Sequence, residues 1–262
     1  MKPLSLATAF LSIMIIQTAM ARDLSDIFRS GVLRIGTTGD YAPLTLCDKQ
    51  GRCEGFAIDM AHSLGKYLSQ VSGKTMIVEF VRTHWPDLHN DLENDGFDIA
   101  MGGITYTEDR DAQFLLSDPV IPSGKVVLMQ KSMASAYTGL NDLQLVKQLS
   151  TSNLHLVINP GGTNQTFTMK YLPHMRSTLT ADNREPFLML RDHQSDVMIT
   201  DRTEALYQVK QIPSLMIIND DMFSWTVSHK VYMTQKNNRA LLSEVNRWLK
   251  ETDIQRIQTR WF

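Results

Sequence analysis

The chain has little net charge and very few cysteines. Its 262 residues contain 26 Lys and Arg against 28 Asp and Glu, which gives a formal net charge of −2. Nucleic acids and anionic membranes attract proteins with a clear positive excess, so the composition gives no electrostatic case for either partner. Beyond the N-terminus, no apolar run reaches the ~20 residues that span a bilayer. We therefore expect neither nucleic-acid binding nor stable membrane insertion.

Several motifs of catalytic and metal sites are also missing. The 7 histidines are scattered, and no pair has H-E-x-x-H spacing, so we expect no metal site. The absence of G-x-S-x-G disfavours a serine hydrolase of that type. The glycine turn at residues 159–164 lacks Gly-Lys-Ser/Thr, which argues against a nucleotide P-loop.

The first 21 residues have the pattern of a secretory signal peptide. Met1-Lys2 precedes an apolar run from Leu4 to Ile16, and Ala19-Met20-Ala21 forms an A-x-A cleavage site. A membrane anchor is the alternative, but the apolar run is short for a span. We predict cleavage after Ala21 and export to the periplasm.

The two cysteines, Cys47 and Cys53, bracket a turn-like stretch that contains a glycine. Cysteines that flank a hairpin in an oxidising compartment are expected to form a disulfide. A redox or metal pair is the alternative, but the C-x-x-C spacing is absent. We predict a structural disulfide.

Strand-like and helix-like segments alternate along the chain, which predicts an α/β fold with largely parallel sheets. Strands are predicted at 32–37, 76–81, 97–101, 124–130, 154–158, 177–180, 197–199, 215–218 and 230–234, and helices at 56–68, 85–94, 165–172, 186–191 and 237–249. The third strand is predicted to stop at Gly102-Gly103. We predict two lobes, residues 22–127 plus 227–262 and residues 128–226, with a ligand crevice between them.

Polar residues at predicted strand ends are candidates for this crevice. Asp40 follows the first strand in a glycine and proline turn, which alone is a weak signal. Thr105 and Arg110 follow the third strand; a threonine can hydrogen-bond a carboxylate and an arginine can grip one with two parallel bonds. Lys125 begins the long fourth strand, and Trp85 begins a predicted helix. A surface arginine, a solvated strand end and a core tryptophan are the alternatives.

The turn at residues 159–164 (NPGGTN) lies between a strand and a helix. Successive backbone N–H groups at such a turn form an anion site, and a carboxylate is the anion we expect beside Thr163 and Asn164. The alternative is a plain helix start with Thr163 as the capping residue.

Two carboxylates mark the end of the strand at 197–199. Asp201 has the sequence context of an N-cap, and Glu204 follows one helical turn later on the same face. Burial and nearby Asp201 would raise the pKa of Glu204, whereas the helix N-terminus and Lys125 would lower it. The sequence leaves the direction open.

Taken together, the segments 31–37 (GVLRIGT), 55–61 (GFAIDMA) and 97–101 (FDIAM), with Thr105 and Arg110, resemble the extracellular solute-binding proteins for amino acids. The resemblance implies two α/β lobes that close on a ligand. It implies that Arg110 binds the ligand α-carboxylate and Asp201 the α-amino group. An ABC permease would then be the partner.

A closer resemblance is to one enzymatic branch, the periplasmic cyclohexadienyl dehydratases. It rests on 37–41 (TTGDY), Trp85-Pro86, Gly124-Lys125, 159–164, and Thr200-Asp201 with Glu204. The branch converts prephenate or arogenate to phenylpyruvate or phenylalanine with no metal or organic cofactor, and the resemblance implies that Glu204 is the general acid. A dicarboxylate substrate suits the cations of the crevice. A transport binding protein remains the alternative, and a detached sensor lobe is disfavoured.

Overall fold

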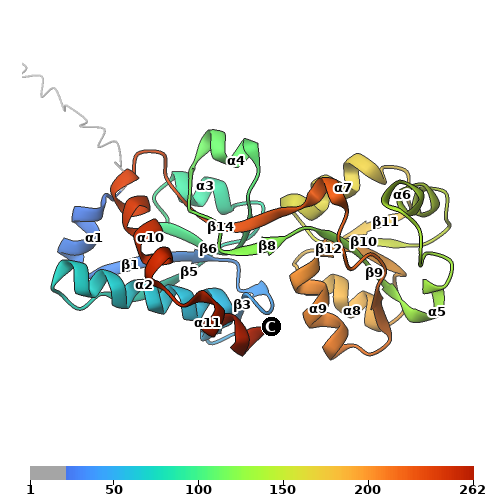
Figure 1. Cartoon of the computed structure of the whole chain (residues 1–262), viewed down its shortest axis with the longest axis horizontal. Coiled ribbons are helices and arrows are strands. Elements are labelled where there is room, and N and C mark those ends of the chain that lie inside the picture. The colour runs from blue at the N-terminus through green and yellow to red at the C-terminus, as the bar shows by residue number, and fades with distance from the viewer. Residues whose placement is uncertain (1–21) are drawn as a thin grey trace, which may run out of the picture.

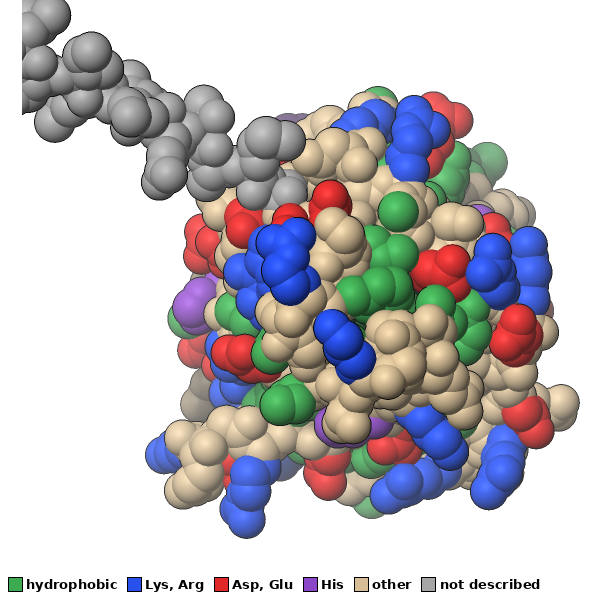
Figure 2. Space-filling model, turned by 90° about the vertical axis from the view of Figure 1, so that its left-hand side faces the viewer, with side chains coloured by type: hydrophobic (Ala, Val, Ile, Leu, Met, Phe, Trp, Pro, Cys, Tyr) green, Lys and Arg blue, Asp and Glu red, His purple; other side chains and the backbone are tan. Residues whose placement is uncertain are grey.

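The computed structural model describes residues 22–262; the predicted signal peptide lies outside the described residues. Two lobes, each a β-sheet covered by helices, lie side by side, with strands running between them (Figure 1). Within residues 22–262, every helix is too short or too polar to cross a membrane. On the outer end of the first lobe, Lys and Arg alternate with Asp and Glu side chains (Figure 2).

The sheet of the first lobe joins three parallel strands to antiparallel ones. Its order is β5 (Ile77–Arg82), β1 (Val32–Thr37), β6 (Ile99–Thr105), β14 (Ser228–Thr234) and β7 (Leu115–Leu116), with β8 (Ile121–Ser123) also paired to β14. The helices of this lobe are α1 (Leu24–Ser30), α2 (Phe56–Ser72), α3 (Leu88–Glu93), α4 (Glu108–Gln113), α10 (Arg239–Glu251) and α11 (Ile254–Trp261). Ile35, Leu64 and Trp248 are among the residues of its apolar core.

The second lobe repeats this plan around its own core. Its strand order is β11 (Ser177–Leu179), β10 (Leu156–Ile158), β12 (Val197–Asp201), β9 (Lys125–Gln130) and β13 (Leu215–Ile217). Its helices are α5 (Lys131–Ala134), α6 (Asp142–Ser150), α7 (Gly162–Tyr171), α8 (Glu185–Arg191) and α9 (Arg202–Gln211), and the 3-10 helix η1 spans Ser224–Thr226. Val127, Phe167 and Ile199 belong to its core.

The α/β class and the two-lobed architecture are as the sequence predicts, with two corrections. The sheets are mixed, because β9 and β14, which follow the crossings between lobes, both run antiparallel to their neighbours. The first crossing lies at Gly124, before the predicted boundary at 127, because Lys125 already pairs with Asp201 in the second sheet.

The prediction that the third strand stops at Gly102-Gly103 is wrong, since β6 continues to Thr105. Both glycines have positive φ, 144° and 100°. A Cβ atom on Gly103 would lie only 2.2 Å from the ring of Tyr41. Glycine is used here because the Tyr41 ring packs directly on the strand backbone.

The predicted helix at 85–94 is shorter in the structure, because α3 begins only at Leu88. Trp85 therefore lies in the loop before the helix. Its ring meets that of Tyr41 edge to face, with 5.6 Å between the centroids. Trp85 lies at the side of the first lobe that faces the second, since it lines a cavity together with residues of the second lobe.

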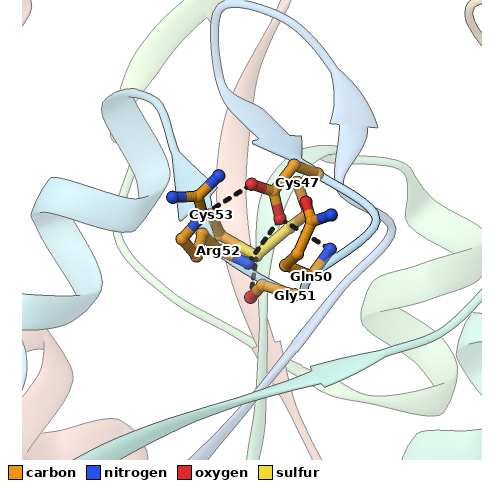
Figure 3. The surroundings of a disulfide bond; sticks show 6 residues. Cys47, Gln50, Gly51, Arg52 and Cys53 are labelled. Atoms are coloured by element: carbon orange, nitrogen blue, oxygen red, sulfur yellow. Dashed lines mark hydrogen bonds and ion pairs between the residues drawn. A yellow bond between two sulfur atoms is a disulfide. The ribbon is translucent and has the colours of Figure 1, made fainter.

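The predicted disulfide is present in a small hairpin. Strands β2 (Asp40–Tyr41), β3 (Thr45–Cys47) and β4 (Cys53–Glu54) form a separate sheet, and Cys47 is bonded to Cys53 across β3 and β4 (Figure 3). Asp48 Oδ1 accepts hydrogen bonds from the backbone N–H groups of Gln50 and Arg52, both at 2.9 Å. The turn is therefore held by both covalent and polar contacts.

Replacing Cys47 and Cys53 together by serine is expected to lower the free energy of unfolding by about 2 kcal/mol. The reason is that the bond closes a short loop and so restricts the unfolded chain. Urea unfolding of the wild type with and without reductant, beside the double variant, measures the effect. Equal midpoints in all three samples would contradict it.

Candidate functional site

A small cavity lies between the lobes; about 20 Å³ of it is open to the centre of a water-sized sphere, which is room for about one water molecule. The first lobe lines it with Tyr41, Trp85, Gly103, Thr105 and Arg110. The second lobe lines it with Asn159, Gly161, Gly162, Thr163, Asn164, Asn183 and Asp201.

The residues that line the cavity come from segments at the carboxyl ends of the parallel strands. The segments after β1 and β6 supply Tyr41 and Arg110, the turn after β10 supplies Asn159, and β12 ends in Asp201. The carboxyl ends of parallel strands meet at one edge of a sheet, and ligands bind in the crevice outside that edge. Here the two sheets bring these edges face to face.

Asp201 is the centre of a buried network of charges. Lys125 Nζ lies 2.7 Å from its Oδ1, and Lys230 Nζ lies 2.7 Å from its Oδ2. The Tyr41 hydroxyl also donates a hydrogen bond to Oδ2. Burial favours the neutral acid, but the two lysines outweigh it and hold the pKa of Asp201 well below its usual range.

Asp201 occupies the N-cap position of α9, as predicted, but its side chain caps no backbone N–H group. The ionic partners take its oxygens instead. A carboxylate that caps a helix accepts one neutral donor, whereas this one accepts from two ammonium groups. Asp201 therefore balances the charges of the two lysines and does not cap α9.

The two lysines lie on the crossing strands β9 and β14. Lys125 Nζ also contacts Thr163 Oγ1 at 2.6 Å and donates to Asn164 Oδ1, so its ammonium group lies behind the lining. Lys230 Nζ donates to Thr105 Oγ1 at 2.9 Å. Burial lowers the pKa of both lysines, that of Lys230 to about 8.

Lys230 is not among the predicted site residues, although its position in the sequence indicates a buried charge. It is the one charged residue of β14, whose last five residues are all buried. A lysine in a buried strand implies a buried partner. The identity of that partner could not be inferred, because Asp201 belongs to the other lobe.

Glu204 also lies just behind the lining, in the first turn of α9. It is 1% exposed, and Asn183 Nδ2 lies 2.5 Å from its Oε1. Thr200 Oγ1 lies 2.5 Å from its Oε2. Burial raises the pKa of Glu204 well above its usual range, and the charge of Asp201 adds to this, although the bonds from Thr200 and Asn183 oppose it.

Asn183 links Glu204 to the first lobe, although it belongs to no recognisable sequence motif. Its backbone N–H donates to Asp40 Oδ2 at 3.2 Å across the lobes. Asn159 Nδ2 donates to its Oδ1 at 2.5 Å. Asp40 itself does not line the cavity; it contacts the site through Asn183.

Arg110 differs from the two lysines because it has no acidic partner among residues 22–262. Its side chain belongs to α4, and Nη1 donates to the backbone oxygen of Thr105 at 2.7 Å. The residue is 7% exposed, and burial lowers its pKa. A buried cation without a counter-ion is costly, so the cavity is suited to an anionic ligand.

The glycine turn approaches the first lobe very closely. A Cβ atom on Gly161 would lie 3.1 Å from Cβ of Trp85. The helix α7 begins at Gly162 with Gly161 at its N-cap, so the alternative in which Thr163 caps this helix is wrong. Thr163 and Asn164 contact Lys125 through their side chains instead.

The predicted site residues thus fall into two groups. Six of them line the cavity: Trp85, Thr105, Arg110, Thr163, Asn164 and Asp201. Asp40, Lys125 and Glu204 contact lining residues from behind. Between residues 22 and 262, the structure contains no group of three or more His, Cys, Asp and Glu side chains arranged to hold a metal ion.

Comparison with known proteins places this architecture in a family. Residues 33–262 match the bacterial extracellular solute-binding proteins, family 3. A cyclohexadienyl dehydratase of Pseudomonas aeruginosa is 33% identical over 86% of this chain and 79% of its own length. A putative amino-acid ABC transporter-binding protein of Vibrio harveyi is 23% identical, over 93% of this chain and 94% of its own.

Among solved structures, an ancestral amino acid-binding protein described as a precursor of cyclohexadienyl dehydratase is similar to this one. Its TM-score is 0.79 at 28% identity, covering 91% of this chain and 98% of the other. The match to the family model spans both lobes and nearly every described residue. The chain belongs to family 3 of the bacterial extracellular solute-binding proteins.

Proposed function

We propose that this protein is a periplasmic cyclohexadienyl dehydratase, which converts prephenate or arogenate to phenylpyruvate or phenylalanine with loss of water and carbon dioxide. The observation that carries the proposal is Glu204, a buried acid whose pKa is raised well above its usual range, next to a cation-rich cavity. Binding an amino acid needs no such acid. The similarity to the Pseudomonas aeruginosa dehydratase supports the same conclusion.

The reaction has one step that requires a proton. The bond between the ring carbon and its carboxylate breaks, and carbon dioxide leaves. The electron pair of that bond enters the ring, which becomes aromatic as the bond between the opposite ring carbon and its hydroxyl oxygen breaks. Hydroxide is a poor leaving group, so Glu204 supplies a proton and water departs. The resulting carboxylate of Glu204 regains a proton from solvent.

Burial makes Glu204 suited to this step. A carboxyl group in water would be ionised near neutral pH, whereas burial stabilises the protonated form of Glu204. Thr200 and Asn183 fix the two carboxyl oxygens, so the acid is held in place before the substrate binds. Glu204 lies one side chain away from the cavity, because Asn183, its hydrogen-bond partner, lines it.

Arg110 is the residue we assign to a substrate carboxylate. It lines the cavity and has no carboxylate partner in the described chain. The paired lysines add positive charge from behind the lining, and the 159–164 turn offers further polar groups. A substrate with two carboxylates would therefore be attracted to the space between the lobes, which must separate to admit it.

We further propose that residues 1–21 direct export and are removed, which would place the enzyme in the periplasm. The disulfide between Cys47 and Cys53 supports an oxidising compartment. The second candidate function is amino-acid binding for an ABC permease. The similarity to the Vibrio harveyi protein favours it.

The decisive experiment is an assay of the purified protein with prephenate and with arogenate. The formation of phenylpyruvate or phenylalanine is measured directly, and binding of a panel of amino acids is measured by calorimetry on the same preparation. Turnover supports the dehydratase. The absence of turnover, together with micromolar or tighter binding of an amino acid, would overturn it in favour of transport.

Replacing Arg110 by glutamine is expected to lower kcat/KM by about 10- to 100-fold, mainly through KM. A hydrogen bond between charged groups contributes about 1.5–3 kcal/mol, and the substrate carboxylate would lose it. The exposed Arg191, paired with Asp192 on the surface, supplies the control Arg191→Gln. An unchanged KM in Arg110→Gln would show that the carboxylate binds elsewhere.

A further inference from the structure

We propose that the cavity selects its substrate by the charge at the α-position, and that it takes the α-keto dicarboxylate, prephenate, in preference to its α-amino counterpart, arogenate. This inference rests on the proposed function and makes it more specific. It comes from the hydrogen bonds and ion pairs of Asp201, the one carboxylate among residues 22–262 that lines the cavity.

The oxygens of Asp201 are already fully engaged. Oδ1 accepts from Lys125 Nζ at 2.7 Å and from Ser123 Oγ at 3.3 Å. Oδ2 accepts from Lys230 Nζ at 2.7 Å and from the Tyr41 hydroxyl. An ionised carboxylate has about four acceptor positions. A substrate ammonium group would therefore have to displace a lysine from a buried ion pair before it could reach Asp201.

The charges around the cavity disfavour such an exchange. Arg110, Lys125 and Lys230 contribute three cations, and Asp201 neutralises one of them. Two further acids lie behind the lining, as the lysines do. Burial raises the pKa of Glu204 and so favours its neutral form, whereas Asp40 offsets one more cation, which leaves the cations in excess by one. Two like charges placed together in a poorly solvated site cost several kcal/mol.

The polar atoms that remain without a partner suit the keto substrate better. Trp85 Nε1 is a buried donor with no acceptor among residues 22–262, and a keto or carboxylate oxygen can accept its hydrogen. Asn159 Oδ1 is a buried acceptor without a donor in the same part of the chain. A neutral acceptor cannot balance an ammonium charge. Another acceptor beside the site that lacks a donor among the described residues, Asp40 Oδ1, belongs to a residue that does not line the cavity, so the amino substrate remains poorly compensated.

The wild-type protein should therefore show a kcat/KM for prephenate at least about tenfold above that for arogenate. A tenfold ratio corresponds to about 1.4 kcal/mol, less than the cost of an uncompensated charge. Both substrates are assayed on one preparation at the same pH and ionic strength. Equal efficiency, or a preference for arogenate, would overturn the inference and leave the dehydratase in place. The absence of turnover on either substrate would overturn the proposed function itself.

The variant Lys230→Gln tests the physical cause. It removes one cation and frees Oδ2 of Asp201 for an ammonium group, so the ratio of kcat/KM for prephenate to that for arogenate should fall about tenfold or more. Lys66→Gln, on the exposed face of α2, is the matched control and should keep the wild-type ratio. An unchanged ratio in a folded Lys230→Gln protein would overturn the role given to the Asp201 network.

A second variant keeps the test decisive if Lys230→Gln does not fold. Tyr41→Phe removes one hydrogen-bond donor from Oδ2 without changing any charge. It should shift the ratio toward arogenate by a smaller factor, about two- to fivefold, which is under 1 kcal/mol. A shift toward prephenate would contradict the proposal.

Discussion

Replacing Glu204 by glutamine is expected to reduce kcat by about 10²- to 10⁴-fold, which is the usual contribution of a positioned general acid. Glutamine has nearly the same shape and can keep contacts with Asn183 and Thr200, but it has no proton to give. KM should change little, because the lost proton acts on the leaving hydroxyl in the transition state and Arg110, which we assign to the substrate carboxylate, is unchanged. Steady-state kinetics with the preferred substrate measures the effect.

The control for this substitution is Glu251→Gln, at the exposed end of α10. It makes the same chemical change far from the cavity and should leave kcat at the wild-type value. If Glu204→Gln kept more than about a tenth of the wild-type kcat, Glu204 would not be the general acid.

The raised pKa of Glu204 also makes the stability of the fold depend on pH. The direction of this dependence is opposite to that of an acid whose pKa is lowered by an ion pair. The folded protein holds the proton more tightly than the unfolded chain does, so stability falls as the pH rises from the ordinary pKa of glutamate toward the raised one. In the variant Glu204→Gln no carboxyl group titrates at this position, so this loss of stability at higher pH does not occur. Its melting temperature should equal or exceed that of the wild type at pH 8.

The same titration should shape the activity of the wild type. The general acid must be protonated, so kcat is expected to fall as the pH rises through the raised pKa of Glu204. A kcat that stays flat up to the unfolding limit at high pH would contradict this.

Replacing Asp201 by asparagine should have the largest effect on stability. The change leaves Lys125 and Lys230 buried without a counter-ion. Breaking a buried ion pair by removing one partner costs about 3–5 kcal/mol. For a chain of this size, the melting temperature should then fall by roughly 6–20 °C.

The pH dependence of stability distinguishes the loss of the lysines' counter-ion from a general packing defect. The pKa of Lys230 is already lowered to about 8 by burial, so this lysine can lose its charge at moderately high pH. The stability difference between the wild type and Asp201→Asn should therefore shrink between pH 6 and pH 9. In the wild type, the lowered pKa of Asp201 stabilises the fold above the ordinary aspartate pKa, and this contribution is lost as the pH falls below it.

Asp220→Asn is the control for Asp201→Asn. Asp220 pairs with Arg202 on the surface, where both side chains are more than a third exposed. Such pairs contribute about 0–1 kcal/mol. A fall in melting temperature no larger for Asp201→Asn than for Asp220→Asn would show that the buried network is not stabilising.

Much of the fold can be predicted from the sequence because its signals are local. Strand β1 and the start of α2 lie where the apolar pattern predicts them, since periodicity depends only on neighbouring residues. The disulfide follows from two cysteines beside one turn. The extension of β6 through two glycines could not be predicted, because it depends on the ring of Tyr41 packing from another segment.

The candidate site shows the same division. The sequence predicts that Arg110 and Asp201 lie at the crevice, because residues that follow strands gather at one edge of a sheet, but it does not reveal Asn183 or Lys230. The partners and charges of these residues are visible only in the folded protein. The fold pairs Asp201 with lysines from two crossing strands and, among residues 22–262, gives Arg110 no counter-ion. It also buries Glu204, because burial and charge depend on neighbours from both lobes, which no local pattern contains.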